Sequence, residues 1–327
     1  MVEVKGVIQY TMKVSPKVSV IMNCLNCGRY LCEAIDSVYA QTYKDWEIIF
    51  WDNASIDNSA EIAKSYDDRL KYFRGDKTVP LYAARNLALK QAKGEYIGFL
   101  DCDDLWLSTK LEKQLKLFSR EKVGLVFCNT FFMNQKTGNE RVLYNKKPLT
   151  GMIFRQLLSN YFLSLQTVLI RRKCLDRLNE WFDDRFDMVG DVDLFTRIAF
   201  DWELDYVDDP LAKWRIHGDN MTFKKMGLFG KELLMMLDKY KRSYSNFQND
   251  YKEEIENIKA RAAYYEAVEE WKTGNGNKSR KIILPHIANN PKFLIVYLIS
   301  VLPYKKYSNI LRIVGRYVLT KLIFLQG

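Results

Sequence analysis

Residues 97–106 constrain the fold of this chain more than any other stretch, because an apolar run ends there in closely spaced carboxylates. The run 96–100 is short and apolar, a pattern typical of a buried strand in a parallel sheet. Asp101, Asp103 and Asp104 follow it directly. Carboxylates this close repel one another, and a hard divalent cation with oxygen ligands is their natural partner. Because ligands of open α/β sheets bind at the carboxyl ends of strands, the stretch predicts a metal site.

The same carboxylates have a simpler interpretation. They could belong to an acidic loop between a strand and a helix, with Ser108 capping a helix that buries Leu111 and Leu115. Acidic loops of this kind are common. These residues alone therefore leave both interpretations open.

Apolar runs alternate with segments of helical periodicity over most of the chain. The predicted strands are 18–22, 46–51, 70–73, 96–100, 123–129 and 166–171. The predicted helices are 28–41, 59–66, 82–92, 110–118, 151–160 and 191–201, and 131–144 is a predicted hairpin that turns near 137–139. This order predicts an α/β fold with a mostly parallel central sheet, helices on both faces and right-handed crossovers. Gly94 is the expected C-cap of the helix before the central strand.

The excess positive charge of the chain lies at its C-terminal end. The sequence has 50 Lys and Arg against 40 Asp and Glu, which gives a net charge of +10. Residues 271–327 hold ten of the basic residues and none of the acidic ones, so the remainder is balanced at 40 against 40. A body without a basic face of its own is not expected to bind nucleic acid.

The six cysteines do not form the framework of a secreted protein, because they lie in apolar or helical patterns. Cys24 and Cys27 have the spacing of half a redox or zinc motif, but no second pair follows at zinc spacing. We therefore expect ordinary thiols in a reducing cytoplasm. The N-terminus carries charges and no apolar segment typical of a signal peptide.

Several short motifs occur in the order found in one enzyme family. They are VSVIM (18–22), WDNASID (51–57), ARN (84–86), GEYIGFLDCDD (94–104), GDVD (190–193) and WRIH (214–217). Together they resemble family 2 glycosyltransferases, which have the nucleotide-sugar-binding GT-A fold. The resemblance covers 17–222 and implies an inverting enzyme that uses a UDP-sugar and Mg²⁺ or Mn²⁺.

The resemblance assigns the donor site to strand ends and one helix. Asp52 corresponds to the aspartate that accepts a hydrogen bond from the uracil ring, and Asn23 closes the neighbouring strand. Arg85 corresponds to the arginine that contacts the nucleotide or its phosphates. By itself, Arg85 would be interpreted as a solvated charge on a helix.

The family's DxD motif matches Asp101, Cys102 and Asp103. In the family the first aspartate lies near the ribose, and the second holds the divalent ion on the diphosphate. Asp104 is expected to share the metal, and His217 corresponds to a histidine that approaches the metal or the diphosphate. A loop histidine with a structural hydrogen bond is the alternative for His217.

Asp191 corresponds to the family's catalytic base, which takes the proton of the acceptor hydroxyl. The alternative is a helix N-cap, with Asp193 in the first turn favoured by the helix dipole. If Asp191 is not the base, Asp193 is the next candidate.

The implied function is transfer of a sugar to a hydroxyl of a glycan or lipid-linked glycan in bacterial polysaccharide synthesis. One alternative is a nucleotidyltransferase, which would need a glycine-rich basic loop where this chain has 23–28. Another is a non-enzymatic scaffold that binds a membrane or glycan. The retained Asp52, Asp103 and Asp191 argue against a decayed site.

The expected organisation is a lead-in at 1–16, a catalytic domain at 17–223 and a helical extension at 224–273. Within the catalytic domain, 17–104 forms the nucleotide-binding half and 105–223 the acceptor half.

A linker at 274–277 begins a basic amphipathic tail, 274–327, which is expected to associate with the inner, anionic face of the cell membrane. Its apolar run 293–304 is too short to span a bilayer, but Phe293, Tyr297, Ile313 and Tyr317 could enter its surface. The alternative for the tail is a helical extension packed on the catalytic domain.

Overall fold

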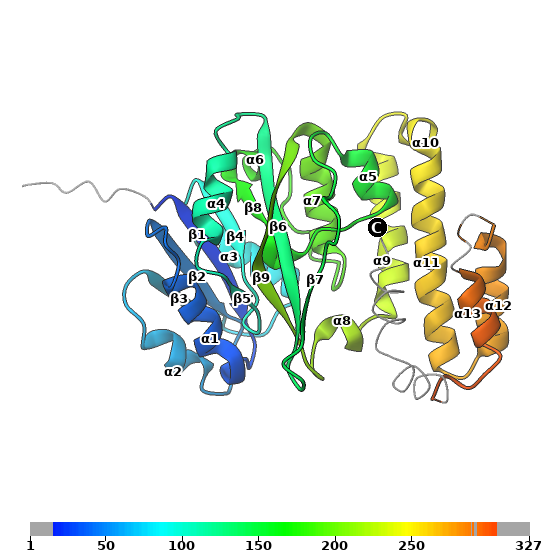
Figure 1. Ribbon diagram of the computed structural model, residues 1–327, viewed down its shortest axis with the longest axis horizontal. Coiled ribbons are helices and arrows are strands. Elements are labelled where there is room, and N and C mark those ends of the chain that lie inside the picture. Colours follow the sequence, from blue (N-terminus) through cyan, green and yellow to red (C-terminus); the bar gives the residue numbers. More distant parts are fainter. Residues whose placement is uncertain (1–15, 289, 291–292, 306–327) are drawn as a thin grey trace, which may run out of the picture.

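The computed structural model describes residues 16–288, 290 and 293–305. Its centre is one mixed sheet, in the order β3-β2-β1-β4-β8-β6-β9-β5, with β7 paired to β6. Helices cover both faces of this sheet, and further helices stack beyond one end of it (Figure 1). The α/β architecture with a helical C-terminal extension is confirmed.

The first half of the fold alternates strands and helices as predicted. Its elements are β1 (Val18–Cys24), α1 (Gly28–Tyr39), β2 (Trp46–Asp52), α2 (Ser59–Lys64), β3 (Leu70–Arg74), α3 (Leu81–Gln91) and β4 (Tyr96–Phe99). The strands pair in parallel, so their carboxyl ends meet at one edge. Val20 and Met22 of β1 pack towards α1, whereas Ile21 packs towards α3.

The second half adds antiparallel pairs and a long strand that the sequence did not reveal. Its elements are β5 (Leu105–Trp106), α4 (Lys110–Leu117), β6 (Val123–Asn134), β7 (Glu140–Val142), α5 (Phe154–Ser159), η1 (Leu165–Thr167), β8 (Leu169–Arg171), α6 (Arg172–Asp176), α7 (Gly190–Asp201), β9 (Glu203–Ile216) and α8 (Met221–Lys224). Strand β8 runs antiparallel to both β4 and β6, whereas β9 runs parallel to β6. The predicted hairpin is present, and Gly138 in its turn has a φ of +68°.

Gly94 is not the C-cap of α3. That helix ends at Gln91, and its C-cap is Ala92, which adopts an extended conformation. A Cβ atom on Gly94 would lie 2.4 Å from the backbone nitrogen of Ser19, so close approach to β1 explains the glycine. Likewise, Thr109 rather than Ser108 precedes α4, and no side chain caps that helix.

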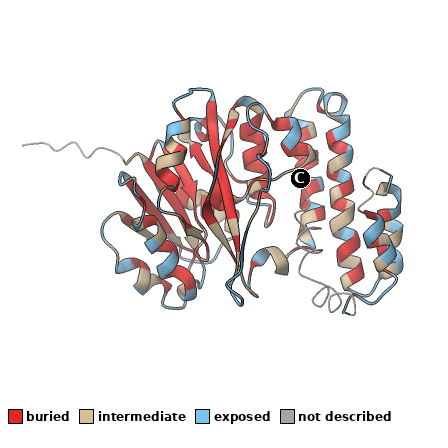
Figure 2. Ribbon diagram, viewed as in Figure 1, coloured by how far each residue is buried: buried red, intermediate tan, exposed pale blue. Residues whose placement is uncertain are grey.

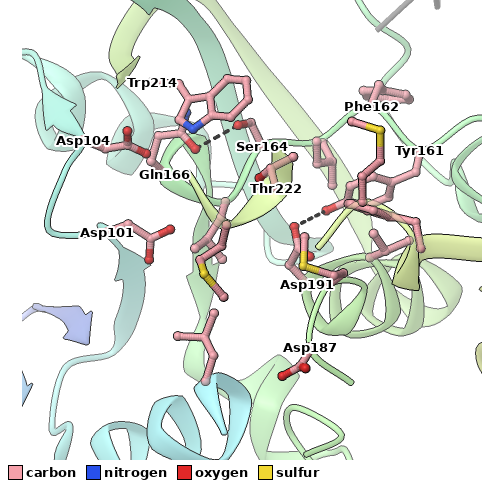
Figure 3. Close-up of a pocket in the computed structure, with 18 of the residues that line it drawn as sticks. Asp101, Asp104, Tyr161, Phe162, Ser164, Gln166, Asp187, Asp191, Trp214 and Thr222 are labelled. Atoms are coloured by element: carbon pink, nitrogen blue, oxygen red, sulfur yellow. Dashed lines mark hydrogen bonds between the residues drawn. The ribbon is translucent and has the colours of Figure 1, made fainter. Parts of the chain in front are cut away.

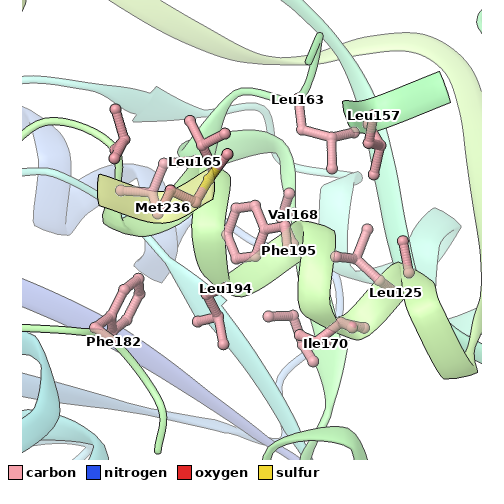
Figure 4. Packing of buried hydrophobic residues seen from close by; sticks show 14 of the residues in the cluster. Leu125, Leu157, Leu163, Leu165, Val168, Ile170, Phe182, Leu194, Phe195 and Met236 are labelled. Carbon is pink, nitrogen blue, oxygen red and sulfur yellow. The ribbon is translucent and has the colours of Figure 1, made fainter. Parts of the chain in front are cut away.

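The C-terminal elements extend the core beyond the sheet. They are α9 (Leu228–Ser243), α10 (Phe247–Asp250), α11 (Lys252–Lys272), α12 (Gly276–Ile283), η2 (Leu284–His286) and α13 (Phe293–Ile299). Figure 2 shows the buried sheet and the buried inner sides of these helices. In Figure 4, Met236 of α9 lies in the same apolar cluster as Phe195 of α7 and Leu125 of β6.

The described part of the predicted tail packs on α11. Phe293 is 6% exposed and stacks on Tyr264, with ring centroids 5.5 Å apart. The indole N–H of Trp271 donates to the carbonyl oxygen of Leu302 (2.7 Å). Phe293 is therefore not free to enter a membrane in this conformation, contrary to the expectation for it.

The predicted linker at 274–277 is a turn. Gly274 has a φ of +93°, and α12 begins at Gly276. Ile313 and Tyr317, with the rest of 306–327, lie outside the described residues, as does nearly all of the lead-in at 1–16. Among the described residues, no helix combines the length and the hydropathy needed to cross a membrane.

Candidate active site

The carboxyl end of β4, the helix α3 and the start of α7 border a single cavity. Its volume is about 300 Å³, and Arg85, Asp101, Asp104 and Asp191 are among its lining residues. Figure 3 shows Asp101 and Asp104 on one side, with Asp191 and Tyr161 on the other. The fold therefore brings Arg85, Asp101 and Asp104 to one cavity with the expected base Asp191, although they are far apart in the sequence. The other expected donor and metal residues do not line this cavity; they are Asn23, Asp52, Cys102, Asp103 and His217.

Arg85 is part of the site and not a solvated helix charge. Its side chain is almost fully buried, and its guanidinium donates to Asp101 Oδ1 at 2.6 Å. Burial acts to lower the pKa of Arg85, but the charge of Asp101 and the ring of Tyr82 outweigh it, and the pKa is raised. The cation therefore stays charged beside Asp101 and also feels the carboxylate of Asp191.

Asp103 and His217 form the pair best suited to a divalent ion. The Nε2 atom of His217 lies 2.9 Å from Asp103 Oδ2, and its Nδ1 accepts a hydrogen bond from the backbone of Asp219 (3.1 Å). Neighbouring ligands of an octahedral Mg²⁺ also lie about 2.9 Å apart, from its metal–oxygen distances. Burial and the charge of Asp101 raise the pKa of Asp103, and His217 offsets part of that rise. Asp103 offers the hard oxygen ligand that such an ion needs, whereas His217, whose Nδ1 accepts a hydrogen bond while its Nε2 shares a proton with Asp103, would have to change tautomer to bind the ion through Nε2.

Asp104 mainly holds the loop to β9. Its side chain is 2% exposed, and its Oδ1 accepts the backbone N–H of Arg215 at 2.9 Å. Burial, with the charges of Asp103 and Asp101, raises its pKa well above the ordinary value. Arg215 also donates to the carbonyl oxygen of Asp103 (2.8 Å) and pairs with Glu33 (2.7 Å). A metal role for Asp104 stays a prediction.

Asn23 has unused hydrogen-bonding capacity at the end of β1. Its side-chain oxygen and nitrogen are both buried, and neither finds a partner within the described part of the chain. An orphaned buried amide costs free energy unless a ligand or water satisfies it. This is what a residue that contacts a polar ligand is expected to show.

Asp52 and Cys102 lie deeper than the resemblance implies. Asp52 is fully buried, and it accepts hydrogen bonds from the Ser55 backbone (2.7 Å), Tyr72 (2.6 Å) and Arg74 (2.5 Å). Burial acts to raise its pKa, but these partners lower it. A uracil N–H would have to compete with them. Cys102 is 2% exposed, and its thiol donates to the carbonyl oxygen of Asn23 (3.2 Å), so its side chain is buried and does not line the cavity.

Asp191 is the second residue of α7 and is not its N-cap, which is Val189. Its Oδ1 accepts a hydrogen bond from Tyr82 (3.1 Å), and its Oδ2 lies 3.5 Å from the Tyr161 hydroxyl. Burial raises its pKa, and Arg85 and Tyr82 offset only part of that rise. The carboxylate is therefore a stronger base than an exposed aspartate.

Asp193 cannot replace Asp191 as the base. It is fully buried, and its carboxylate pairs with Arg197 and Lys239, each at 2.9 Å. A carboxylate held by two cations is poorly placed to take a proton from a substrate. Burial and these two ion pairs therefore argue against Asp193 as the catalytic base.

Comparison with known proteins agrees with this geometry. The sequence profile described as glycosyl transferase family 2 matches residues 19–178. An uncharacterized glycosyltransferase of Methanocaldococcus jannaschii is 32% identical over 245 residues, which cover 71% of this chain and 82% of that protein. The chain belongs to glycosyltransferase family 2. Membership decides against the nucleotidyltransferase and scaffold alternatives.

Other relatives of this family 2 transferase differ in length. A Rickettsia felis uncharacterized glycosyltransferase is 32% identical over 242 residues, and the match spans 71% of this chain but only 39% of that protein. The Escherichia coli protein named UDP-Glc:alpha-D-GlcNAc-diphosphoundecaprenol beta-1,3-glucosyltransferase WfgD is 31% identical over 166 residues, 49% of this chain and 62% of its own.

Solved structures support the GT-A fold. The mannosyltransferase PcManGT from Pyrobaculum calidifontis, in complex with GDP-Man and Mn²⁺, matches with a TM-score of 0.59 and 18% identity, over 88% of this chain and 85% of that one. S. aureus TarS in complex with UDP-GlcNAc matches with a TM-score of 0.55 and 18% identity, over 89% and 92%.

Sequence reasoning missed three contributors to the transferase site. Glu232 of α9 accepts hydrogen bonds from the backbones of Asp187 (3.0 Å), Met188 (2.8 Å) and Val189 (3.1 Å), and so fixes the start of α7. An acid within an amphipathic helix gives no local signal for this role. The other two contributors are residues that line the cavity.

Tyr161 and Gln166 line the cavity beside Asp191. Gln166 is 3% exposed, and its oxygen accepts the Ser164 hydroxyl (2.8 Å), while its amide nitrogen finds no partner among the described residues. A buried donor of this kind is suited to a sugar hydroxyl. The sequence predicts a strand over 166–171, which would place Gln166 within the sheet. In the structure β8 begins only at Leu169, and Gln166 lies in η1, where it lines the cavity.

Proposed function

We propose that this enzyme transfers a sugar from a UDP-sugar to an acceptor hydroxyl with inversion at the anomeric carbon. The observation that carries the proposal is one cavity lined by both Asp101 of the DxD motif and Asp191. A donor held at the acidic loop would present its sugar towards Asp191. An acceptor activated there would attack from the face opposite the leaving diphosphate, which inverts the configuration.

The proposed base is Asp191, held by the hydroxyls of Tyr82 and Tyr161. Its raised pKa favours proton transfer from an alcohol, and general base catalysis contributes about 10²–10⁴ in rate. Gln166 would donate its free amide N–H to a sugar hydroxyl. Arg85 would neutralise part of the negative charge that develops on the diphosphate.

Asp103 and His217 would hold Mg²⁺ or Mn²⁺, and the ion would supply charge neutralisation to the departing diphosphate. Uridine as the base is supported by the orphaned Asn23 amide and by the UDP-sugars named for TarS and WfgD. PcManGT, named with GDP-Man, shows that this fold also accepts guanosine. The hexosyl or N-acetylhexosaminyl nature of the donor rests on the same names.

The proposed acceptor is a glycan linked to a lipid diphosphate in bacterial polysaccharide synthesis. Beyond Asp191, the cavity continues along α9 and α11, where Met226, Phe229 and Leu233 make its wall apolar. Arg261 lines the same end. Its guanidinium donates to the carbonyl oxygens of Leu158 (3.4 Å) and Ser159 (3.3 Å) and forms no ion pair with any described residue, and burial lowers its pKa. A cation within an apolar wall suits a diphosphate that carries a lipid, the class named for the acceptor of WfgD.

Contact with an anionic membrane on the cytoplasmic side would bring the enzyme to such an acceptor. The basic composition of 271–327 supports it, together with Leu294, Leu298 and Val301, which are exposed on and just after α13. Phe293 does not contribute in the packed conformation.

Cosedimentation of the full chain with anionic vesicles should weaken as salt is added, because salt screens the attraction between basic residues and anionic lipids. A lack of binding at low salt would refute the proposed membrane contact.

Removal of the proposed metal ligand should abolish the divalent-ion dependence of donor binding. Wild-type protein should bind UDP tightly with Mn²⁺ and weakly in EDTA, because diphosphate is otherwise repelled by the acidic loop. Asp103→Asn should reduce the Mn²⁺-dependent affinity by about 10- to 100-fold. Isothermal titration with UDP measures this, and Asp205→Asn, at a position outside the site, is the matched control. Equal affinity of wild-type protein in EDTA and Mn²⁺ would refute the metal role.

Asp191→Asn should lower the transfer rate by about 10²–10⁴ and leave UDP binding nearly unchanged. In the wild type, Asp191 must be ionised, so kcat should fall as pH decreases through its raised pKa. The acid limb should therefore lie above the ordinary aspartate value of about 3.9. A radiolabelled-sugar assay across pH measures both effects, and near wild-type turnover by the variant would place the base elsewhere.

Arg261→Gln should raise the KM for a lipid-diphosphate-linked acceptor by about tenfold, since a charge-assisted contact is worth about 1.5–3 kcal/mol. The same variant should leave the KM for the donor unchanged. Arg242→Gln, the same change at an exposed position of α9, is the control. If both variants behave alike, Arg261 does not recognise the acceptor.

A further inference from the structure

Three cysteines that are separated in sequence meet beneath the acidic loop. Cys24 ends β1, Cys27 precedes α1 and Cys102 lies within the loop. Their sulfur atoms all lie within 4.8 Å of one another. The pair Cys24 and Cys27 alone has only half of a metal-binding motif, and the third thiol comes from the end of a neighbouring parallel strand.

The spacing of these thiols is close to that of a soft-metal site. Zinc–sulfur bonds of about 2.3 Å in a tetrahedral arrangement place the sulfur atoms about 3.8 Å apart. Sulfur atoms that already lie within 4.8 Å need only a small inward movement to reach this arrangement. Cys24 and Cys102 are almost fully buried, which would shield a bound ion from water.

The present contacts of the thiols are weak and replaceable. The Cys102 thiol donates to the carbonyl oxygen of Asn23 (3.2 Å), and that of Cys27 to the carbonyl oxygen of Leu25 (3.5 Å). The sulfur of Cys24 lies 3.7 Å from the hydroxyl oxygen of Ser55.

The cluster is distinct from the proposed Mg²⁺ or Mn²⁺ site. The side chains of Asp101 and Asp103 are 41% and 31% exposed, whereas the side chain of Cys102 between them is buried. The two sides of the loop therefore offer oxygen and sulfur ligands, respectively. Hard ions prefer the oxygen side, and thiophilic ions prefer the sulfur side.

We propose that Cys24, Cys27 and Cys102 bind one thiophilic divalent ion of the Zn²⁺ class, with the fourth position taken by water or the Ser55 hydroxyl. Thiol protons leave for solvent as the ion binds. The ion would tie the end of β1 and the start of α1 to the loop that carries Asp101 and Asp103. It would act structurally, by fixing the loop, and would not take part in the transfer itself.

The test uses the full chain, reduced and freed of metal, with Cd²⁺ and Co²⁺ as probes in the presence of excess Mg²⁺. Wild-type protein should bind one equivalent of Cd²⁺, with thiolate-to-metal charge-transfer absorption, and Co²⁺ should give the intense visible bands of tetrahedral sulfur coordination. Cys27→Ser should weaken binding by at least about tenfold. Serine is favoured before a helix, so this variant should keep the fold, which thermal unfolding verifies.

Two controls separate the cluster from other ligands. Cys32→Ser, which removes an exposed thiol of α1, should leave the charge-transfer band unchanged. Asp103→Asn should also keep the band while it weakens Mn²⁺-dependent UDP binding, so this inference and the proposed function can fail separately. Absence of the band in reduced wild-type protein, or a band that survives Cys27→Ser and is lost with Cys32→Ser, would overturn the proposal.

Discussion

The structure depends on keeping three neighbouring carboxylates together at the end of β4. Each one is held by a different partner from another part of the chain. The pairs are Asp101 with the guanidinium of Arg85, Asp103 with the imidazole of His217, and Asp104 with the backbone N–H of Arg215. Burial and the neighbouring like charges still raise the pKa of Asp103 and Asp104, and their partners offset only part of that rise. Two of the three partners come from the end of β9 or just after it, so that strand is required for the donor site.

The base depends on a second set of long-range contacts, made by α9. Glu232 accepts three backbone hydrogen bonds before α7, and Lys239 neutralises the buried Asp193 within the helix. Both residues lie on one helix, in the stretch that the sequence suggests is an extension. Their contacts fix the position of Asp191, so α9 belongs to the catalytic scaffold. Truncating an apparent extension of this kind would therefore disturb the chemistry as well as the stability.

The sequence predicted those elements that are defined by local patterns. The parallel strands of the first half are continuous apolar runs, and their helices have a clear apolar face, so both were found within a few residues. Strand β9 was missed because Asp208, Asp209 and Pro210 interrupt its pattern. At that point the ladder with β6 steps from Val207 directly to Pro210, a bulge that admits the polar residues and the proline. Local periodicity cannot reveal a strand whose irregularity is set by its partner.

The sequence could predict only those parts of the site whose chemistry is evident from residues that are adjacent in the chain. Three carboxylates after a strand favour a cation but also fit an acidic loop, and the family resemblance was needed to assign Asp101 and Asp103 to the donor site. The partner of Asp104 and the packing of Cys102 depend on which strands become neighbours, which spacing along the chain does not encode. The residues from Asp101 to Asp104 form a tight turn, in which the backbone N–H of Asp104 donates to the carbonyl oxygen of Asp101 (3.1 Å). In this turn the side chain of Cys102 is buried beside Cys24, at the end of the adjacent strand, whereas those of Asp101 and Asp103 stay partly exposed.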